Sequence, residues 1–191
     1  PRAAYAALIT SLDEHVGRVL ALLDELGLAH DTLVVFTSDN GTTHRSADGR
    51  FGIGGVDAPF FDSTAGLRGY KGSVYEGGLR VPYIARWPGR IAAGSVADQP
   101  VYFADQLPTL LDACGVPPPP GLDGTSLWPV LSGRTSTIER PPMIWVFTEY
   151  GGQVAIRIDQ WKVVRQGLAR PGSPGPWELY DVVADPSEAH D

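Results

Sequence analysis

The chain has 191 residues, a formal net charge of −7 and 19% charged residues, which is an ordinary globular composition. Nucleic-acid phosphates repel an acidic chain, so the composition argues against nucleic-acid binding. A single cysteine, Cys114, excludes an intrachain disulfide and a zinc site built from several cysteines. No apolar run approaches the ~20 residues that a membrane-spanning helix needs.

The first predicted element is a long amphipathic helix over residues 3 to 26. Gly27 suits the end of this helix, because glycine adopts left-handed backbone angles without strain. The chain starts directly in this helical pattern, so we expect further sequence upstream of Pro1. The apolar positions recur at three- and four-residue steps, as one face of a helix requires: Leu8, Leu12, Val16, Val19, Leu20, Leu23 and Leu26.

A short apolar strand is predicted next, at residues 33 to 37. Apolarity on both faces is typical of a central parallel strand covered by helices on both sides, so the pattern indicates an α/β sheet. Ser38-Asp39-Asn40-Gly41 follows at the carboxyl end of this strand, the edge where open α/β sheets bind ligands. The Asp39 carboxylate and the Asn40 amide oxygen are hard ligands that suit Ca²⁺ or Mg²⁺. The alternative interpretation is an ordinary Asp-Asn-Gly turn.

A long glycine-rich stretch occupies residues 41 to 80. Such stretches inside a compact domain are usually functional or disordered, and the interspersed aromatic residues favour an ordered loop here. Lys71 lies between glycines that let a ligand approach closely, and its compact charge suits a sulfate or phosphate oxygen. The alternatives are a solvated surface lysine at Lys71 and a weak local ion pair between Glu76 and Arg80.

The rest of the chain is predicted to change character near residue 140. Before that point we expect a strand at residues 81 to 87 and a helix at residues 107 to 114, with Cys114 in the core. After it, short strands separated by turn-rich links indicate an antiparallel sheet. These strands are predicted at residues 144–148, 154–158, 161–165 and 177–181.

We therefore divide the chain into an α/β portion, residues 1–140, and a small antiparallel C-terminal subdomain, residues 141–191.

The motifs, taken in order, resemble those of the type I sulfatase family within the alkaline-phosphatase-like superfamily. The resemblance covers nearly the whole chain and is greatest to the branch of bacterial arylsulfatases and N-acetylgalactosamine-6-sulfatases. The three motifs with chemical roles are Ser38-Asp39-Asn40-Gly41, Gly69-Tyr70-Lys71-Gly72 and Tyr75-Glu76-Gly77-Gly78-Leu79-Arg80-Val81-Pro82. Further matches are Arg86-Trp87-Pro88-Gly89, Leu107-Pro108-Thr109-Leu110-Leu111, Glu178-Leu179-Tyr180-Asp181 and Asp185-Pro186-Ser187-Glu188.

This resemblance implies the C-terminal portion of an alkaline-phosphatase-like mixed sheet flanked by helices, followed by a small antiparallel sheet. It makes Asp39 and Asn40 ligands of one calcium ion, which would hold the sulfate and act as a Lewis acid. It makes Lys71 the catalytic and substrate-binding residue that grips the sulfate ester. His44 would line the substrate subsite, although an exposed loop histidine is the alternative.

The family's nucleophile is a formylglycine made from a cysteine or serine in a Cys/Ser-x-Pro-x-Arg motif. Cys114 is followed by Gly115-Val116-Pro117 and does not match. We therefore expect the nucleophile in a missing N-terminal half of the same protein, and we expect residues 1–191 alone to be inactive. Without that half, an unpaired sheet edge and exposed apolar surface would favour self-association.

The resemblance implies a sulfuric ester hydrolase that acts on a sulfated small molecule or carbohydrate, and it favours a periplasmic or secreted location. One alternative is a phosphate or phosphonate ester hydrolase of the same superfamily. Asn40 argues against the two-zinc enzymes of that kind, which tend to place histidine there because imidazole suits zinc. The other alternative is a non-catalytic relative that kept the fold.

Overall fold

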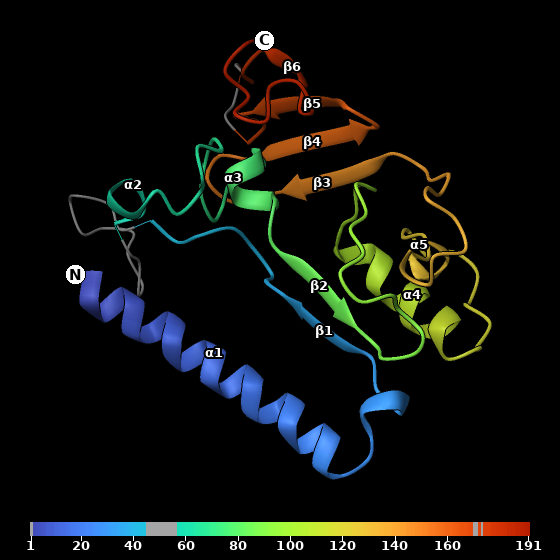
Figure 1. The fold of residues 1–191 in the computed structure, drawn as a ribbon. Helices are drawn as coiled ribbons and strands as arrows, with labels where there is room; N and C mark the ends of the chain where they lie inside the picture. Colours follow the sequence, from blue (N-terminus) through green and yellow to red (C-terminus); the bar gives the residue numbers. More distant parts are fainter. Residues whose placement is uncertain (1, 45–56, 170–171, 173) are drawn as a thin grey trace. The chain divides into compact units, whose positions relative to one another are not determined.

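A computed structural model describes residues 2–44, 57–169, 172 and 174–191 (Figure 1). The chain forms two compact units, which interleave along the sequence. The first comprises Pro1–Phe36, Tyr83–Gln99 and Leu127–Ile138, and the second comprises Thr37–Pro82, Pro100–Ser126 and Glu139–Asp191. The division proposed at residue 140 stays a prediction.

A long first helix precedes a series of shorter helices and strands. In chain order, the elements are α1 (Arg2–Glu25), η1 (Ala29–Asp31), β1 (Val34–Thr37), α2 (Ala58–Phe61), α3 (Glu76–Leu79), β2 (Tyr83–Arg86), η2 (Phe103–Asp105), α4 (Gln106–Ala113), α5 (Trp128–Leu131), β3 (Met143–Phe147), β4 (Gln153–Ile158), β5 (Trp161–Gln166) and β6 (Trp177–Asp181).

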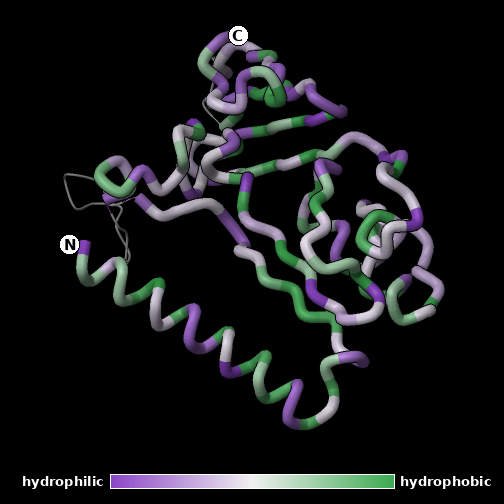
Figure 2. The backbone as a smooth tube through the Cα atoms, in the orientation of Figure 1, coloured by the Kyte–Doolittle hydropathy of each residue, from purple (hydrophilic) through white to green (hydrophobic). Residues whose placement is uncertain are grey.

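Helix α1 confirms the predicted N-terminal helix. Gly27 lies just beyond it at a φ of +68°, the left-handed conformation expected of a residue that ends a helix. Hydrophobic and hydrophilic segments alternate along the helix (Figure 2). None of its residues is buried in the part of the chain that the structure describes. Its apolar face therefore remains exposed, notably at Leu8, Leu12, Val19 and Leu22.

Strands β1 and β2 confirm the strands predicted at residues 33–37 and 81–87, and they form a two-stranded sheet. Their arrows run in opposite directions (Figure 1). The parallel neighbour expected for β1 is thus not found among the described residues. Just after β2, the buried Trp87 donates its indole N–H to the His30 carbonyl at 2.7 Å and contacts the Trp128 ring.

Helix α4 confirms the helix predicted at residues 107–114, but the predicted burial of Cys114 is wrong. Cys114 is exposed because it lies one residue beyond the helix, at its C-cap. The buried residues of α4 are Pro108 and Thr109, near its N-terminal end. The apolar pattern thus located the helix correctly and placed each of its ends one residue too far along the chain.

Strands β3 to β6 confirm the predicted antiparallel sheet. They pair in chain order, and the three pairings are all antiparallel. One face of this sheet packs on the segment that runs through α3, in a core of Val74, Tyr75, Ala155, Val164, Tyr180 and Val182.

The other face of this sheet carries exposed apolar side chains, as its alternating pattern requires. They include Ile144, Val146, Ile158, Trp161, Trp177 and Leu179. The expected exposed apolar surface is therefore present in the described ranges, and self-association stays a prediction.

Candidate functional site

The described part of the glycine-rich stretch is an ordered loop with two short helices, α2 and α3. Asp57 caps α2 by accepting a hydrogen bond from the Phe60 amide at 3.1 Å. Phe51, which contributed to the prediction of order, lies outside the described residues, as do Gly52, Gly54 and Gly55 of the glycine-rich pattern.

Two segments of this region meet through their backbones. We call residues 38–44 the Asp39 loop and residues 68–80 the Lys71 loop. The Gly41 amide donates to the Gly78 carbonyl at 2.9 Å, and the Lys71 amide donates to the Thr42 carbonyl at 2.9 Å. The two motifs predicted to carry chemistry are therefore in direct contact, although about 30 residues separate them in the sequence.

Glycine is required where these loops touch. A Cβ atom on Gly41 would lie 1.9 Å from the Gly77 carbonyl oxygen. Within the Lys71 loop, Cβ atoms on Gly77 and Gly78 would lie 2.2 Å from the carbonyl oxygens of Gly69 and Ser73. Because no real Cβ atom approaches an oxygen so closely, only glycine allows the Lys71 loop to fold back on itself beside the Asp39 loop.

The oxygen atoms of the Asp39 loop suit a hard cation. Asn40 Nδ2 donates to the Gly41 carbonyl at 3.0 Å, so the amide oxygen is the atom left to bind a ligand. The exposed Asp39 carboxylate has no hydrogen bond or ion pair to another described residue. A carboxylate and an amide oxygen on consecutive residues fit Ca²⁺ or Mg²⁺ chemically.

Two oxygen donors are too few for such an ion. The described residues contain no group of three or more His, Cys, Asp or Glu residues that could hold a metal. Asp39 and Asn40 would thus form only part of a complete ligand set.

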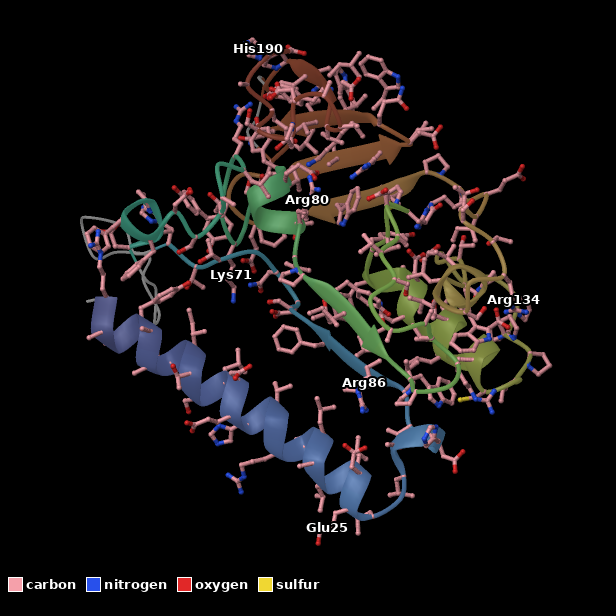
Figure 3. All side chains as sticks on the ribbon, in the orientation of Figure 1. Glu25, Lys71, Arg80, Arg86, Arg134 and His190 are labelled. Atoms are coloured by element: carbon pink, nitrogen blue, oxygen red, sulfur yellow. The ribbon has the colours of Figure 1, made fainter. Side chains whose placement is uncertain are left out.

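Lys71 is exposed, and its ammonium makes no hydrogen bond or ion pair within the described residues. Figure 3 shows its side chain extending from the loop. Among the described residues, the backbone of the loop therefore positions this charge. Convergence of Lys71 with Asp39 and Asn40 on one ion and its bound anion stays a prediction, supported by the backbone contact between the loops.

His44 belongs to the same assembly. Its half-buried imidazole stacks on the Tyr70 ring, with a centroid separation of 4.6 Å and an interplanar angle of 19°. Its Nδ1 atom is buried and has no hydrogen-bond partner among the described residues. Because Tyr70 directly precedes Lys71, the stack places His44 beside the Lys71 loop. Its role in a substrate subsite stays a prediction.

The alternative of a local ion pair between Glu76 and Arg80 is not found among the described residues. Glu76 is 4% exposed, and its carboxylate accepts a hydrogen bond from the Lys162 ammonium of β5 at 2.9 Å. Lys162 also lies 2.9 Å from Glu188 Oε1, and Glu188 Oε2 accepts the Glu76 amide at 2.7 Å. Burial raises the pKa of Glu188 and outweighs the attraction of Lys162. Arg80, in contrast, is exposed.

A second polar cluster anchors the start of the Lys71 loop. Arg68 donates to the Tyr180 hydroxyl at 2.8 Å, and its guanidinium lies 3.9 Å from the Tyr75 ring centroid. The Tyr75 hydroxyl donates to Glu178 at 2.6 Å. Burial, together with the hydrogen bond to Glu178, raises the pKa of Tyr180 to about 12. The same causes raise the pKa of Tyr75.

Family comparisons agree with the motifs. The family model described as Sulfatase matches residues 1–116. A second model, described as N-sulphoglucosamine sulphohydrolase, C-terminal, matches residues 69–191. No helix in the described ranges is long and apolar enough to cross a membrane.

Individual relatives are also sulfatases by name. Mouse steryl-sulfatase is 42% identical over 140 residues, which cover 71% of this chain and 21% of the relative. Rat N-acetylgalactosamine-6-sulfatase is 34% identical over 178 residues, which cover 87% of this chain and 32% of the relative. Zebrafish arylsulfatase K is 32% identical over 196 residues, which cover 98% of this chain and 32% of the relative. The chain thus spans about a third or less of the length of these relatives.

Solved structures give the same result. Ps i-CgsB aligns with a TM-score of 0.73 and 30% identity, covering 98% of this chain and 38% of that structure. BT4656, solved in complex with its substrate D-glucosamine-2-N,6-O-disulfate, aligns with a TM-score of 0.71 and 27% identity, covering 96% and 34%. The alkaline-phosphatase-like fold and the antiparallel C-terminal sheet are therefore confirmed.

Proposed function

Because the chain belongs to the sulfatase family, we propose that it forms one side of the active site of a calcium-dependent sulfuric ester hydrolase. The observation that carries this proposal is the backbone contact between the Asp39 and Lys71 loops. It brings two oxygen donors and a lysine, whose ammonium has no partner in the described part of the chain, onto adjoining segments.

Each residue has a defined task in this proposal. Asp39 and Asn40 bind the calcium ion through the carboxylate and the amide oxygen. Bound calcium supplies a Lewis acid that polarises the sulfate group. Lys71 binds a sulfate oxygen and stabilises the negative charge that develops on the departing ester oxygen. We propose that the formylglycine nucleophile lies outside residues 1–191, since Cys114 lacks the required motif.

The substrate we propose is a sulfated carbohydrate. A structural neighbour was solved with a sulfated sugar substrate, and several relatives are named for a sulfated sugar. The stacked rings of His44 and Tyr70 support this choice, because aromatic rings offer a flat apolar surface beside the proposed sulfate position. The sulfatase matches favour a sulfate ester over a phosphate ester.

The test of the catalytic role uses the intact protein that carries residues 1–191, assayed with an aryl sulfate and an aryl phosphate. Lys71→Ala should lower kcat/KM for the sulfate at least about 100-fold, because it removes charge stabilisation in the transition state. A near-normal rate would remove Lys71 from the site. Residues 1–191 expressed alone should show no turnover, and robust turnover would contradict a nucleophile located elsewhere.

The test of the metal site is thermal. Ca²⁺ should raise the Tm of the intact protein, because an ion that binds only the folded state stabilises it. Asp39→Ala and Asn40→Ala should each reduce this rise. Asp13→Ala, which removes an exposed carboxylate from α1, is the matched control and should leave the rise unchanged. An undiminished calcium response in the Asp39 variant would exclude that ligand.

A further inference from the structure

Gln153, at the start of β4, makes two hydrogen bonds to the Lys71 loop. Its Nε2 donates to the Gly72 carbonyl at 2.9 Å, and its Oε1 accepts the Val74 amide at 3.3 Å. The side chain is buried, at 5% exposed. One amide group thus joins the C-terminal sheet to the backbone immediately after Lys71.

We propose that Gln153 is a positioning residue for Lys71, a role that rests on the proposed function of that lysine. The Lys71 ammonium makes no contact of its own within the described residues, so its position depends on the loop backbone. The Lys71 amide donates a hydrogen bond to the Thr42 carbonyl, and the Gly72 carbonyl accepts one from the Gln153 side chain. The peptide unit before the Lys71 Cα and the one after the Gly72 Cα are therefore held, with a single residue, Gly72, between the second unit and the lysine.

The chemistry of the amide explains why glutamine is needed at this position. The loop presents one carbonyl acceptor and one N–H donor, and a primary amide, with a donor and an acceptor on one planar group, satisfies both at once. A hydrocarbon side chain would leave the buried Val74 amide and the part-buried Gly72 carbonyl without this partner, which is costly. The inward direction of Gln153 follows from strand alternation, because Ala155 and Arg157 on the same face also point toward the segment through α3.

The remaining anchors hold the loop at its ends. Arg68 binds the Tyr180 hydroxyl before Lys71, and Glu76 binds Lys162 after it. Gln153 binds the loop between these two anchors, at Gly72 and Val74, which are closer to Lys71 in the sequence than Arg68 and Glu76 are as a pair. Because the chemistry is sensitive to placement, a displacement of about 1 Å at a reacting group can cost about 100-fold in rate.

The test compares Gln153→Leu with Gln160→Leu in the intact protein. Gln160 lies exposed in the turn between β4 and β5, so its variant controls for the same substitution in the same sheet. Gln153→Leu should lower kcat about 10- to 100-fold with a smaller change in KM. Amide hydrogen exchange should accelerate at residues 71–74 and remain unchanged in β5 and β6. Wild-type exchange throughout the loop, or loss of protection throughout the protein, would overturn the proposal.

A second variant, Gln153→Glu, separates positioning from folding. The ionised carboxylate can accept the Val74 amide but cannot donate to Gly72, whereas the protonated carboxyl group can do both. The kcat/KM of this variant relative to wild type should therefore rise as the pH falls. A ratio that does not change with pH would contradict the role of the Gly72 bond. If the wild type hydrolyses no sulfate ester, the proposed function fails, while the exchange at residues 71–74 still tests the anchoring by Gln153.

Discussion

The Lys162 ammonium lies 2.9 Å from the Glu76 carboxylate, although 86 positions separate the two residues in the chain. Lys162 is fully buried, and a second carboxylate, that of Glu188, lies equally close. This ion cluster ties the end of the Lys71 loop to β5. The long-range contacts of the C-terminal sheet therefore bear on the proposed catalytic lysine.

Replacing Lys162 with methionine should destabilise the protein by about 3–5 kcal/mol, because it leaves the buried Glu188 carboxylate without its cation and Glu76 with only the more distant Arg157 guanidinium, 3.9 Å away. The free energy of unfolding, from urea denaturation, measures this loss. Lys71→Met is the matched control: that lysine is exposed, so stability should change by less than about 0.5 kcal/mol while activity is lost. Equal stability of the two variants would contradict a structural role for the cluster.

Gly41→Ala should destabilise the protein by about 1–3 kcal/mol, because its Cβ would overlap the Gly77 carbonyl 1.9 Å away. It should also weaken calcium binding, since the Asp39 loop must move. Gly17→Ala, in α1 with nothing within 4 Å of its Cβ, is the control and should stabilise the protein by about 0.5–1 kcal/mol. Calorimetry on both variants measures these changes in stability. A Gly41 variant as stable as wild type would show that the loops do not touch.

Arg140→Lys should cost about 1–3 kcal/mol of unfolding free energy, because lysine cannot reproduce a two-bond contact with a carboxylate. Arg140 binds both oxygens of the fully buried Asp105, at 2.7 and 3.0 Å. Arg18→Lys, on the exposed surface of α1, should be neutral. If urea midpoints show the two variants to be equivalent, the contact contributes nothing to stability.

The Tyr180 hydroxyl should ionise at about pH 12, above the ordinary phenol pKa of about 10. The unfolded chain loses this proton first, so its folded-state contribution to stability is complete below about pH 10 and declines between about pH 10 and 12. Spectrophotometric titration of wild type and Tyr180→Phe isolates this phenol by difference. A difference step centred near about pH 10, the ordinary value, would show that the cluster with Glu178 and Arg68 does not form in solution.

The strands and the long helices were predictable because their apolar periods are local. The apolar run in β1, and the turn-rich links that bound β4 and β5, located these strands within about two residues of their observed limits. Helices α2, α3 and α5 have four residues each, too few to show a helical period, and they were missed. The Asp39 and Lys71 motifs were recognised from their resemblance to a family, and the structure adds the backbone contact between them.

The partner of Glu76 could not be found from local spacing, because the pairing depends on tertiary structure. A weak signal was nevertheless present in β5. Lys162 alternates in step with the buried Val164, so it had to face inward, where a lysine needs an acidic partner. An inward charge in a strand is thus a reason to search the distant sequence for its counter-ion.

The buried ion cluster also limits which segments of two related proteins can be joined in a chimera. A chimera that takes the segment containing Lys71 from one parent and the last strands from another receives Glu76 and Lys162 from different sources. If either parent lacks its charge at that position, the hybrid loses the buried Glu76–Lys162 pair that ties the Lys71 loop to β5. The two segments should therefore be taken from the same parent, although Glu76 and Lys162 are 86 positions apart.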